Sequence, residues 1–326
     1  MDRDRLVKLI ESSDLDGLVR FTDGLVAAQE WAGLVELRER CMEANERGKQ
    51  VWGAAHFAEY RLALHSPPPY CVDVLRPNAG RFALGPLWEV AASTHTWAEL
   101  SGVDDARLRT LIGHERAIRG DQVPSEVADR HVVDAPLGLE KWEPPYPVAV
   151  YRSDKADFPE LDHPTLAWVE LPVEHAAEAV ESAAVEALLD LVRPWMEESN
   201  GRAEAVCVEG NHLDAIRELG PGRVRIARVD PARALGAMVW AGASGGAHGR
   251  RRGTPVGRGL AWFALGALLG LEDDWPVEGD ELGDGLAELE WHLWDPGDQA
   301  GGWGFHLAVV DPEDALAWAV TAVDAP

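Results

Sequence analysis

The fold is indicated most clearly by residues 200–231, which read NGRAEAVCVEGNHLDAIRELGPGRVRIARVDP. Two short segments stand out in this stretch, an apolar one at residues 203–208 and a second at residues 223–229. Each has the length and the β-branched residues that are typical of a buried strand, and the first follows an Asn-Gly turn signal. The stretch therefore predicts two strands joined by a polar segment.

The polar segments after these strands carry helix signals. Asn211 can accept a hydrogen bond from the first turn of a helix, and Gly220-Pro221 would end that helix. Asp230 can cap a second helix in which Pro231 occupies the first position, where its missing N–H has no intrahelical partner to lose. We therefore predict a strand–helix–strand–helix series, preceded by a helix over residues 176–197.

Nearer the C-terminus, apolar and polar residues alternate in two segments, at residues 287–293 and 303–309. This alternation predicts two half-buried strands, which should pair as an antiparallel hairpin. The Val-Asp-Pro sequence at residues 310–312 repeats that at residues 229–231. It therefore predicts a last helix, capped by Asp311.

Toward the N-terminus, residues 14–64 and 104–119 place apolar side chains at helical spacing between charged ones, which predicts amphipathic helices. They show no fixed repeat period, so a bundle is favoured over a solenoid. Seven of the 21 prolines lie within residues 134–172 and prevent a continuous helix there. We expect an α+β or mixed α/β protein made of an N-terminal helical bundle at residues 1–131, a proline-rich linker with short edge strands at residues 132–172, and a mixed sheet with helices packed on it at residues 173–326.

Charge and cysteine usage limit the function classes. The formal net charge of -26 repels phosphates, so general binding to nucleic acid or to an anionic membrane is not expected. The three cysteines form no CxxC pair, which is typical of a reducing compartment. The N-terminus lacks the apolar core of a secretory signal, and the longest apolar run, residues 260–271, is too short to span a bilayer. We expect a cytoplasmic protein, and no cofactor is indicated.

One segment contrasts with this acidity, because residues 217–258 contain nine arginines and only two acidic residues. A glycine-rich loop leads there to Thr254-Pro255, which is typical of a helix start with threonine as the cap. A helix N-terminus attracts anions, glycine allows close backbone approach, and arginine donates paired hydrogen bonds. We therefore predict a site for a phosphate-bearing or other anionic ligand, formed by Gly249, Arg250, Arg251, Arg252, Gly253, Thr254 and Arg258.

Other interpretations of this loop stay open. It is no Walker A motif, since Gly253 stands where a lysine is required. The arginines could instead pair with the protein's own carboxylates on a solvated loop. His248, in the same loop, is a candidate general acid or base, or else simply an exposed histidine.

The sequence contains no motif that assigns catalysis or a metal site. His56 and Glu59, for example, have helical spacing, but no third ligand accompanies them. Two functions therefore compete. In the first, the loop binds a small anionic ligand. In the second, the protein is a non-enzymatic interaction or scaffold protein whose helical N-terminal part docks a partner, while the arginines steady the fold or contact an acidic partner.

Overall fold

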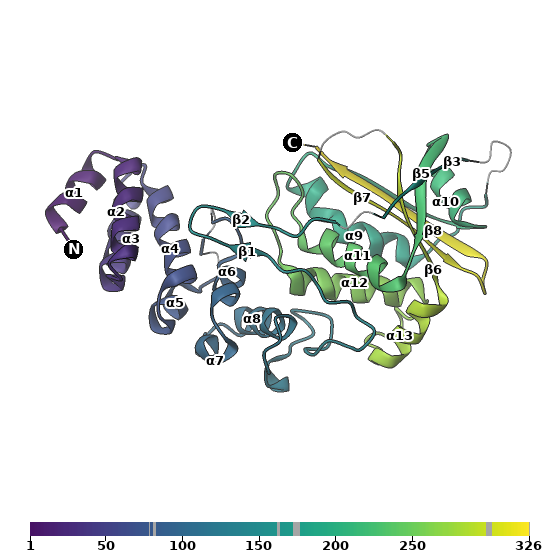
Figure 1. Ribbon diagram of the computed structural model, residues 1–326, viewed down its shortest axis with the longest axis horizontal. Helices are drawn as coiled ribbons and strands as arrows, with labels where there is room; N and C mark the ends of the chain where they lie inside the picture. The colour runs from purple at the N-terminus through teal and green to yellow at the C-terminus, as the bar shows by residue number, and fades with distance from the viewer. Residues whose placement is uncertain (78, 81–82, 162–163, 172–176, 298–301, 326) are drawn as a thin grey trace. The chain divides into compact units, whose positions relative to one another are not determined.

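A computed structural model describes residues 1–77, 79–80, 83–161, 164–171, 177–297 and 302–325 (Figure 1). The protein is α+β, as predicted, with N-terminal helices and a sheet on which further helices pack. The chain divides into two units. The helical unit comprises Met1–Ala128 and Val148–Phe158, and the sheet unit comprises Asp129–Pro147 and Pro159–Pro326.

The helical unit is built from helices that succeed one another along the chain. Their main contacts are with helices one or two positions away in sequence, as in stacked helical hairpins. Three helices begin at an aspartate, Asp2, Asp14 or Asp105, whose side chain accepts a hydrogen bond from a first-turn N–H. The elements of this unit are α1 (Arg3–Glu11), α2 (Leu15–Ala27), α3 (Trp31–Glu46), α4 (Trp52–His65), α5 (Pro68–Val74), α6 (Leu87–Thr94), α7 (Trp97–Leu100), α8 (Ala106–Ile118), η1 (Ser125–Val127), and the hairpin of β1 (Val150–Tyr151) and β2 (Ala156–Asp157).

The sheet unit contains a six-stranded sheet in the order β3-β5-β6-β7-β8-β4, in which every neighbouring pair is antiparallel. Strands β4 and β5 follow one another in sequence but lie near opposite edges, so α10 connects them across the sheet. The elements are β3 (Ala167–Glu170), α9 (Ala183–Glu197), β4 (Arg202–Glu209), α10 (His212–Glu218), β5 (Arg223–Val229), α11 (Pro231–Ala243), α12 (Thr254–Leu268), α13 (Gly279–Glu288), β6 (Glu290–Asp295), β7 (Trp303–Asp311) and β8 (Leu316–Asp324).

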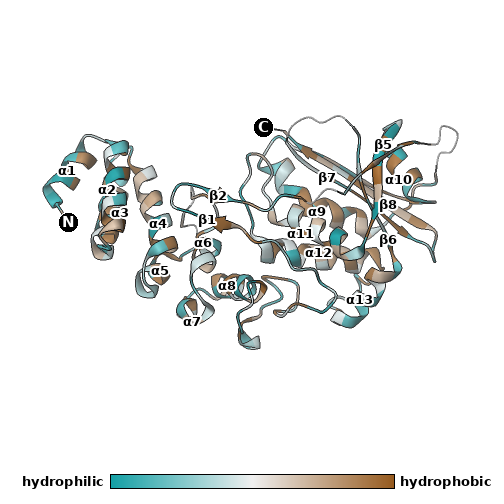
Figure 2. Ribbon diagram, in the orientation of Figure 1, coloured by the Kyte–Doolittle hydropathy of each residue, from teal (hydrophilic) through white to brown (hydrophobic). Residues whose placement is uncertain are grey.

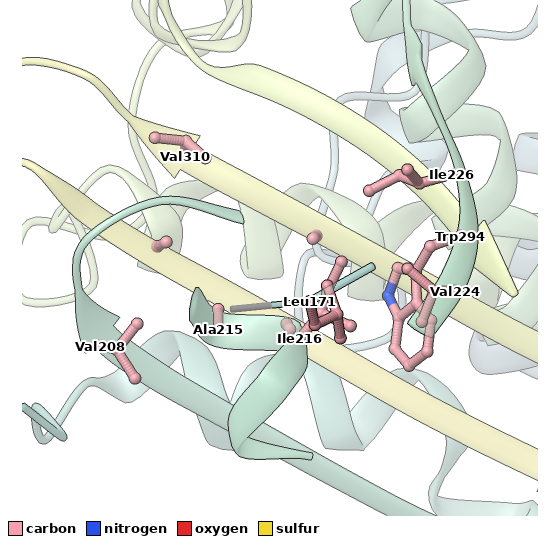
Figure 3. Close-up of a cluster of buried hydrophobic side chains, with 11 residues drawn as sticks. Leu171, Val208, Ala215, Ile216, Val224, Ile226, Trp294 and Val310 are labelled. Atoms are coloured by element: carbon pink, nitrogen blue, oxygen red, sulfur yellow. The ribbon is translucent and has the colours of Figure 1, made fainter. Parts of the chain in front are cut away.

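Helices cover both faces of this sheet. On one face α10 packs against β4, β7 and β8, and Ile216 of α10 joins Ala308 of β7 in a buried apolar cluster (Figure 3). On the other face α9 and α11 contribute Trp195 and Trp240, which meet Trp303 of β7. Helix α12 packs on α9 and α11, and hydrophobic residues run along these elements in Figure 2.

The strand–helix–strand–helix series is confirmed. The N–H of Leu213 donates to Asn211 Oδ1 at 2.8 Å, and the N–H of Arg233 donates to Asp230 Oδ1 at 2.9 Å, so both predicted caps are present. The helix predicted over residues 176–197 begins later. Residue 176 lies outside the described residues, and α9 starts only after Ser182, whose hydroxyl caps it.

The prediction of a last helix after residue 311 is wrong, because Leu316–Asp324 form strand β8. Asp311 Oδ1 accepts hydrogen bonds from the N–H groups of Glu313 at 2.8 Å and Asp314 at 3.2 Å, as a helix cap would. Ala315, with φ of 54°, then reverses the chain. Strand β8 pairs with β7 on one side and β4 on the other, and this two-sided pairing outweighs the local helix signal.

Candidate functional site

The loop predicted to bind an anion joins α11 to α12 in the sheet unit, and it is tied to neighbouring elements by its backbone. The N–H of Ala247 donates to Asp324 Oδ2 at 2.5 Å, and the N–H of Arg250 donates to Glu198 Oε2 at 3.2 Å. Both acceptors are carboxylates, which repel an approaching anion. These N–H groups therefore fasten the loop to β8 and to the end of α9.

The loop glycines allow the chain to approach itself closely. A Cβ on Gly249 would lie 2.1 Å from the carbonyl oxygen of Gly245. Gly253, with φ of 93°, is the N-cap residue of α12, so the helix begins at Thr254 and not after it. The hydroxyl of Thr254 makes no cap hydrogen bond and instead accepts one from Arg251 Nη2 at 3.2 Å.

Arg258 points into the protein and is fully buried. Its Nε donates to Glu143 Oε2 at 2.6 Å and its Nη2 to Glu143 Oε1 at 2.5 Å, which makes a two-pronged ion pair. The same guanidinium donates to the carbonyl oxygens of Pro136 and Gly138. All of these groups belong to the sheet unit. The pair therefore fastens residues 129–147 to α12.

Glu143 completes a buried polar network. Besides Arg258, its carboxylate accepts from the Tyr146 hydroxyl at 2.6 Å, Trp262 Nε1 at 3.1 Å and the N–H of Glu140 at 2.8 Å. Burial alone would raise the pKa of Glu143, but the hydrogen bonds and positive charge of Arg258 outweigh it, and the pKa is lowered. The carboxylate is thus held in its charged form.

Arg252 also has an internal role. Its Nη2 donates to the carbonyl oxygens of Leu191 at 2.7 Å and Asp190 at 3.4 Å, inside α9. Pro194 has no N–H, so the carbonyl of Asp190 lacks its normal helical donor. Arg252 supplies a donor at this position. Burial lowers the pKa of Arg252 to about 10, against the opposing effect of nearby Glu198 and Asp190.

Two of the predicted side chains remain at the surface of the loop. Arg250 and His248 are exposed, whereas Arg251 is half-buried. The N–H of His248 donates to the Ser199 hydroxyl at 3.2 Å. An acid or base role for His248 stays a prediction.

A pocket of about 390 Å³ lies in the helical unit and was missed by sequence reasoning. Its wall is mainly apolar and includes Leu15 of α2, Trp52 and Tyr60 of α4, Leu84 before α6, and Asp154 between β1 and β2. Volumes of this size are typical of ligand pockets. The sequence signal for it is weak, since aromatic residues at four-residue spacing on α4 usually indicate a helix core.

One wall of the pocket is held rigidly by a buried carboxylate. His56, which lines the pocket, places Nδ1 3.0 Å from Glu59 Oε2. Glu59 also accepts from Arg38 Nε at 3.1 Å and from the N–H of Gly80 at 3.0 Å. The His56–Glu59 pairing suggested by helical spacing is therefore a structural contact at the pocket wall.

Several other features bear on the function classes. No cluster of three or more His, Cys, Asp or Glu side chains among the described residues is arranged to hold a metal ion. The three cysteines are free and buried, and burial raises the pKa of Cys41 and Cys71 to about 12 and that of Cys207 to about 11. Within the described part of the chain, none of the helices combines the length and the apolarity needed to cross a membrane.

Comparison with known proteins identifies a family. No curated protein and no solved structure matches the chain. The profile of one protein family, described as "Family of unknown function (DUF6183)", matches residues 16–326. Because this match covers nearly the whole sequence, the chain belongs to the DUF6183 family.

Proposed function

We propose that this protein is a non-enzymatic binding protein whose helical unit docks a segment of a partner protein in the pocket beside α4. One observation carries the proposal: Leu15 and Leu84 are 43% exposed and Trp52 is 39% exposed, and all three line the same pocket. Exposed apolar side chains gathered at one concave site are typical of a surface that a partner covers.

Two further features support docking. Helices that stack on their sequence neighbours present grooves into which peptide segments fit. The pocket wall is also preorganised, because Arg38 and Glu59 form an ion pair at 3.1 Å with side chains only 11% and 3% exposed. A rigid wall lowers the entropy lost when a partner binds.

A peptide-display selection on the full-length protein tests this proposal. Peptides selected on the wild type are counter-selected on a Leu84→Glu variant, which places a charge at the pocket. Leu139→Glu is the matched control, since Leu139 is 39% exposed and does not line the pocket. Burying one large apolar side chain contributes about 1.5–3 kcal/mol, so we expect Leu84→Glu to weaken binding by about tenfold or more. A selection that yields no peptide sensitive to Leu84→Glu would reject the proposal.

Anion binding by the loop stays a hypothesis, and Arg250 and Arg251 are the arginines that we now propose for it. The hydrogen bonds of Arg252 and Arg258 inside the sheet unit favour a structural role for the rest of the loop. Thermal shifts with phosphate and nucleotides, measured for the wild type and an Arg250→Ala/Arg251→Ala variant, test it. Stabilisation that the variant loses would support anion binding, and equal shifts or none would reject it.

We also propose a cytoplasmic location. Free cysteines that are buried as small apolar side chains favour a reducing compartment. Fractionation of cells that express the tagged protein tests this location.

A further inference from the structure

Among the described residues that line the pocket, Asp154 alone carries a formal negative charge. Asp154 stands at the turn between β1 and β2, where it lines the pocket and is exposed. The neighbouring acid Asp157 is paired with Arg152 at 3.0 Å and with Lys155 at 2.8 Å. Asp154, in contrast, forms no ion pair with any residue that the structure describes, and no lysine or arginine is among the described residues that line the pocket. Its charge is therefore available to a partner.

The Asp154 carboxylate acts electrostatically on the pocket wall. Burial raises the pKa of the Tyr60 phenol to about 12; Arg61 opposes this shift, and Asp154 adds to it. The Tyr60 hydroxyl donates to the carbonyl oxygen of Arg152. The Tyr60 ring thus lies within the field of Asp154, and its hydroxyl proton is already engaged.

Aromatic rings next to this carboxylate favour a cation over a neutral group. Trp52, Phe57 and Tyr60 all line the pocket, and the faces of such rings attract ammonium and guanidinium groups. The unit already contains such contacts, for example that of Arg61, which lies 5.2 Å from the Phe57 ring centre. Arg61 is itself paired with Asp23 and does not line the pocket. Arg61 therefore does not neutralise Asp154.

On the basis of the docking function proposed above, we propose that the bound segment carries a lysine next to a large apolar residue. The lysine ammonium lies at Asp154, and the apolar residue fills the pocket beside Trp52 and Leu84. A lysine suits this mouth because its carbon stem packs against apolar walls while its compact charge reaches a single carboxylate. The net charge of -26 further disfavours an acidic segment.

A charge-deletion cycle tests this assignment. Peptides selected on the full-length wild type are resynthesised with the lysine replaced by norleucine, which keeps the stem and removes the ammonium group. Fluorescence anisotropy measures both peptides on wild type, on Asp154→Asn and on Glu126→Gln. Glu126 is an exposed acid of the same unit outside the pocket, so Glu126→Gln controls for net charge.

We expect norleucine to weaken binding to the wild type and to Glu126→Gln by about two- to fivefold, the range of an exposed ion pair. Added salt should reduce this difference, and Asp154→Asn should abolish it. Circular dichroism checks that the variants fold, which an exposed turn residue should not affect.

The outcomes separate the two proposals. Pocket-dependent peptides that lack a basic residue, or a norleucine effect that persists in Asp154→Asn, would overturn the lysine assignment and leave docking in place. Peptides whose Asp154-dependent residue is arginine would also overturn it. A selection with no pocket-dependent peptide would instead contradict docking itself.

Discussion

Replacement of Arg258 by methionine tests the structural role that the contacts of this arginine indicate. Arg258→Met keeps an unbranched side chain in the buried space but removes four hydrogen bonds, two to Glu143 and one each to the carbonyls of Pro136 and Gly138. The Glu143 carboxylate would then be buried without its partner charge. We expect the free energy of unfolding of the sheet unit to fall.

The size of the loss follows from what remains around Glu143. Removal of one partner of a buried ion pair typically costs about 3–5 kcal/mol. Tyr146, Trp262 and the N–H of Glu140 would still donate to the carboxylate. These donors partly stabilise the remaining charge. We therefore expect the free energy of unfolding to fall by about 3 kcal/mol, the lower end of that range.

The pH dependence of this loss has a definite sign. In the wild type the pKa of Glu143 is lowered, so its stabilising contribution is present above the unfolded pKa of about 4.3 and is lost as the pH falls through the folded pKa. In Arg258→Met burial dominates and raises the folded pKa. The protonated carboxyl then contributes stability at low pH, and this contribution is lost as the pH rises through the raised folded pKa. The difference between the two proteins should shrink as the pH falls from neutral toward about 5.

Urea denaturation followed by circular dichroism at several pH values measures this difference. Arg228→Met is the matched control, because Arg228 pairs with Glu290 at 3.0 Å but is 65% exposed, and it should lose less than about 1 kcal/mol. A double Arg258→Met/Glu143→Leu variant should recover part of the loss. The reasoning is refuted if Arg258→Met costs no more than the control, or if its cost is the same at every pH.

Three further substitutions probe the sheet unit. Arg252→Met should lower the free energy of unfolding by about 2 kcal/mol, because its charged hydrogen bonds to α9 carbonyls are lost. The loss should be smaller in a Pro194→Ala background, where the helix itself supplies a donor to the Asp190 carbonyl. Equal losses in the two backgrounds, measured by urea denaturation, would contradict this account. Gly257→Ala would place a methyl group 2.2 Å from a carbonyl oxygen of α11 and should lower the free energy of unfolding by about 1–3 kcal/mol. Gly236→Ala, whose added methyl group would have no atom within 4 Å, should be neutral or stabilising in the same assay. Equal effects of the two substitutions would contradict this expectation. Burial, His212 and Arg228 lower the pKa of His292 to about 4. Its neutral form therefore contributes stability at neutral pH that is lost as the pH falls from about 6.5 toward 4. His292→Phe should remove this dependence of the melting temperature on pH, and an unchanged dependence would argue against this account.

Local signals predicted the elements whose hydrogen bonds close over a few residues. Asn211 and Asp230 cap α10 and α11 as expected. The bounds of β5 were also predicted, from its β-branched residues, although its partner strands β3 and β6 are distant in sequence. Asp311 accepts the same kind of hydrogen bond, yet it begins a hairpin turn. The difference is made by the strands on either side of β8, which no local pattern contains.

The candidate sites could be predicted less well, because their partners are distant in sequence. Arg258 was expected to face a ligand, but its partner Glu143 is 115 residues away and buries it. The pocket likewise joins α4 to Asp154 at the tip of a hairpin much later in the chain. An arginine's charge is visible in a sequence, whereas the group that neutralises it is not.

The sequence by itself therefore determined the helical and strand-rich parts, the caps and turns, and the concentration of arginine in one segment. Only the tertiary structure decided the antiparallel strand order, the internal hydrogen bonds of Arg252 and Arg258, and the presence of an apolar pocket lined by the Asp154 carboxylate. Caps and turns depend on hydrogen bonds within one or two turns of chain. Burial and ion pairing depend on which remote segments meet, and that is set by the packing of the whole fold.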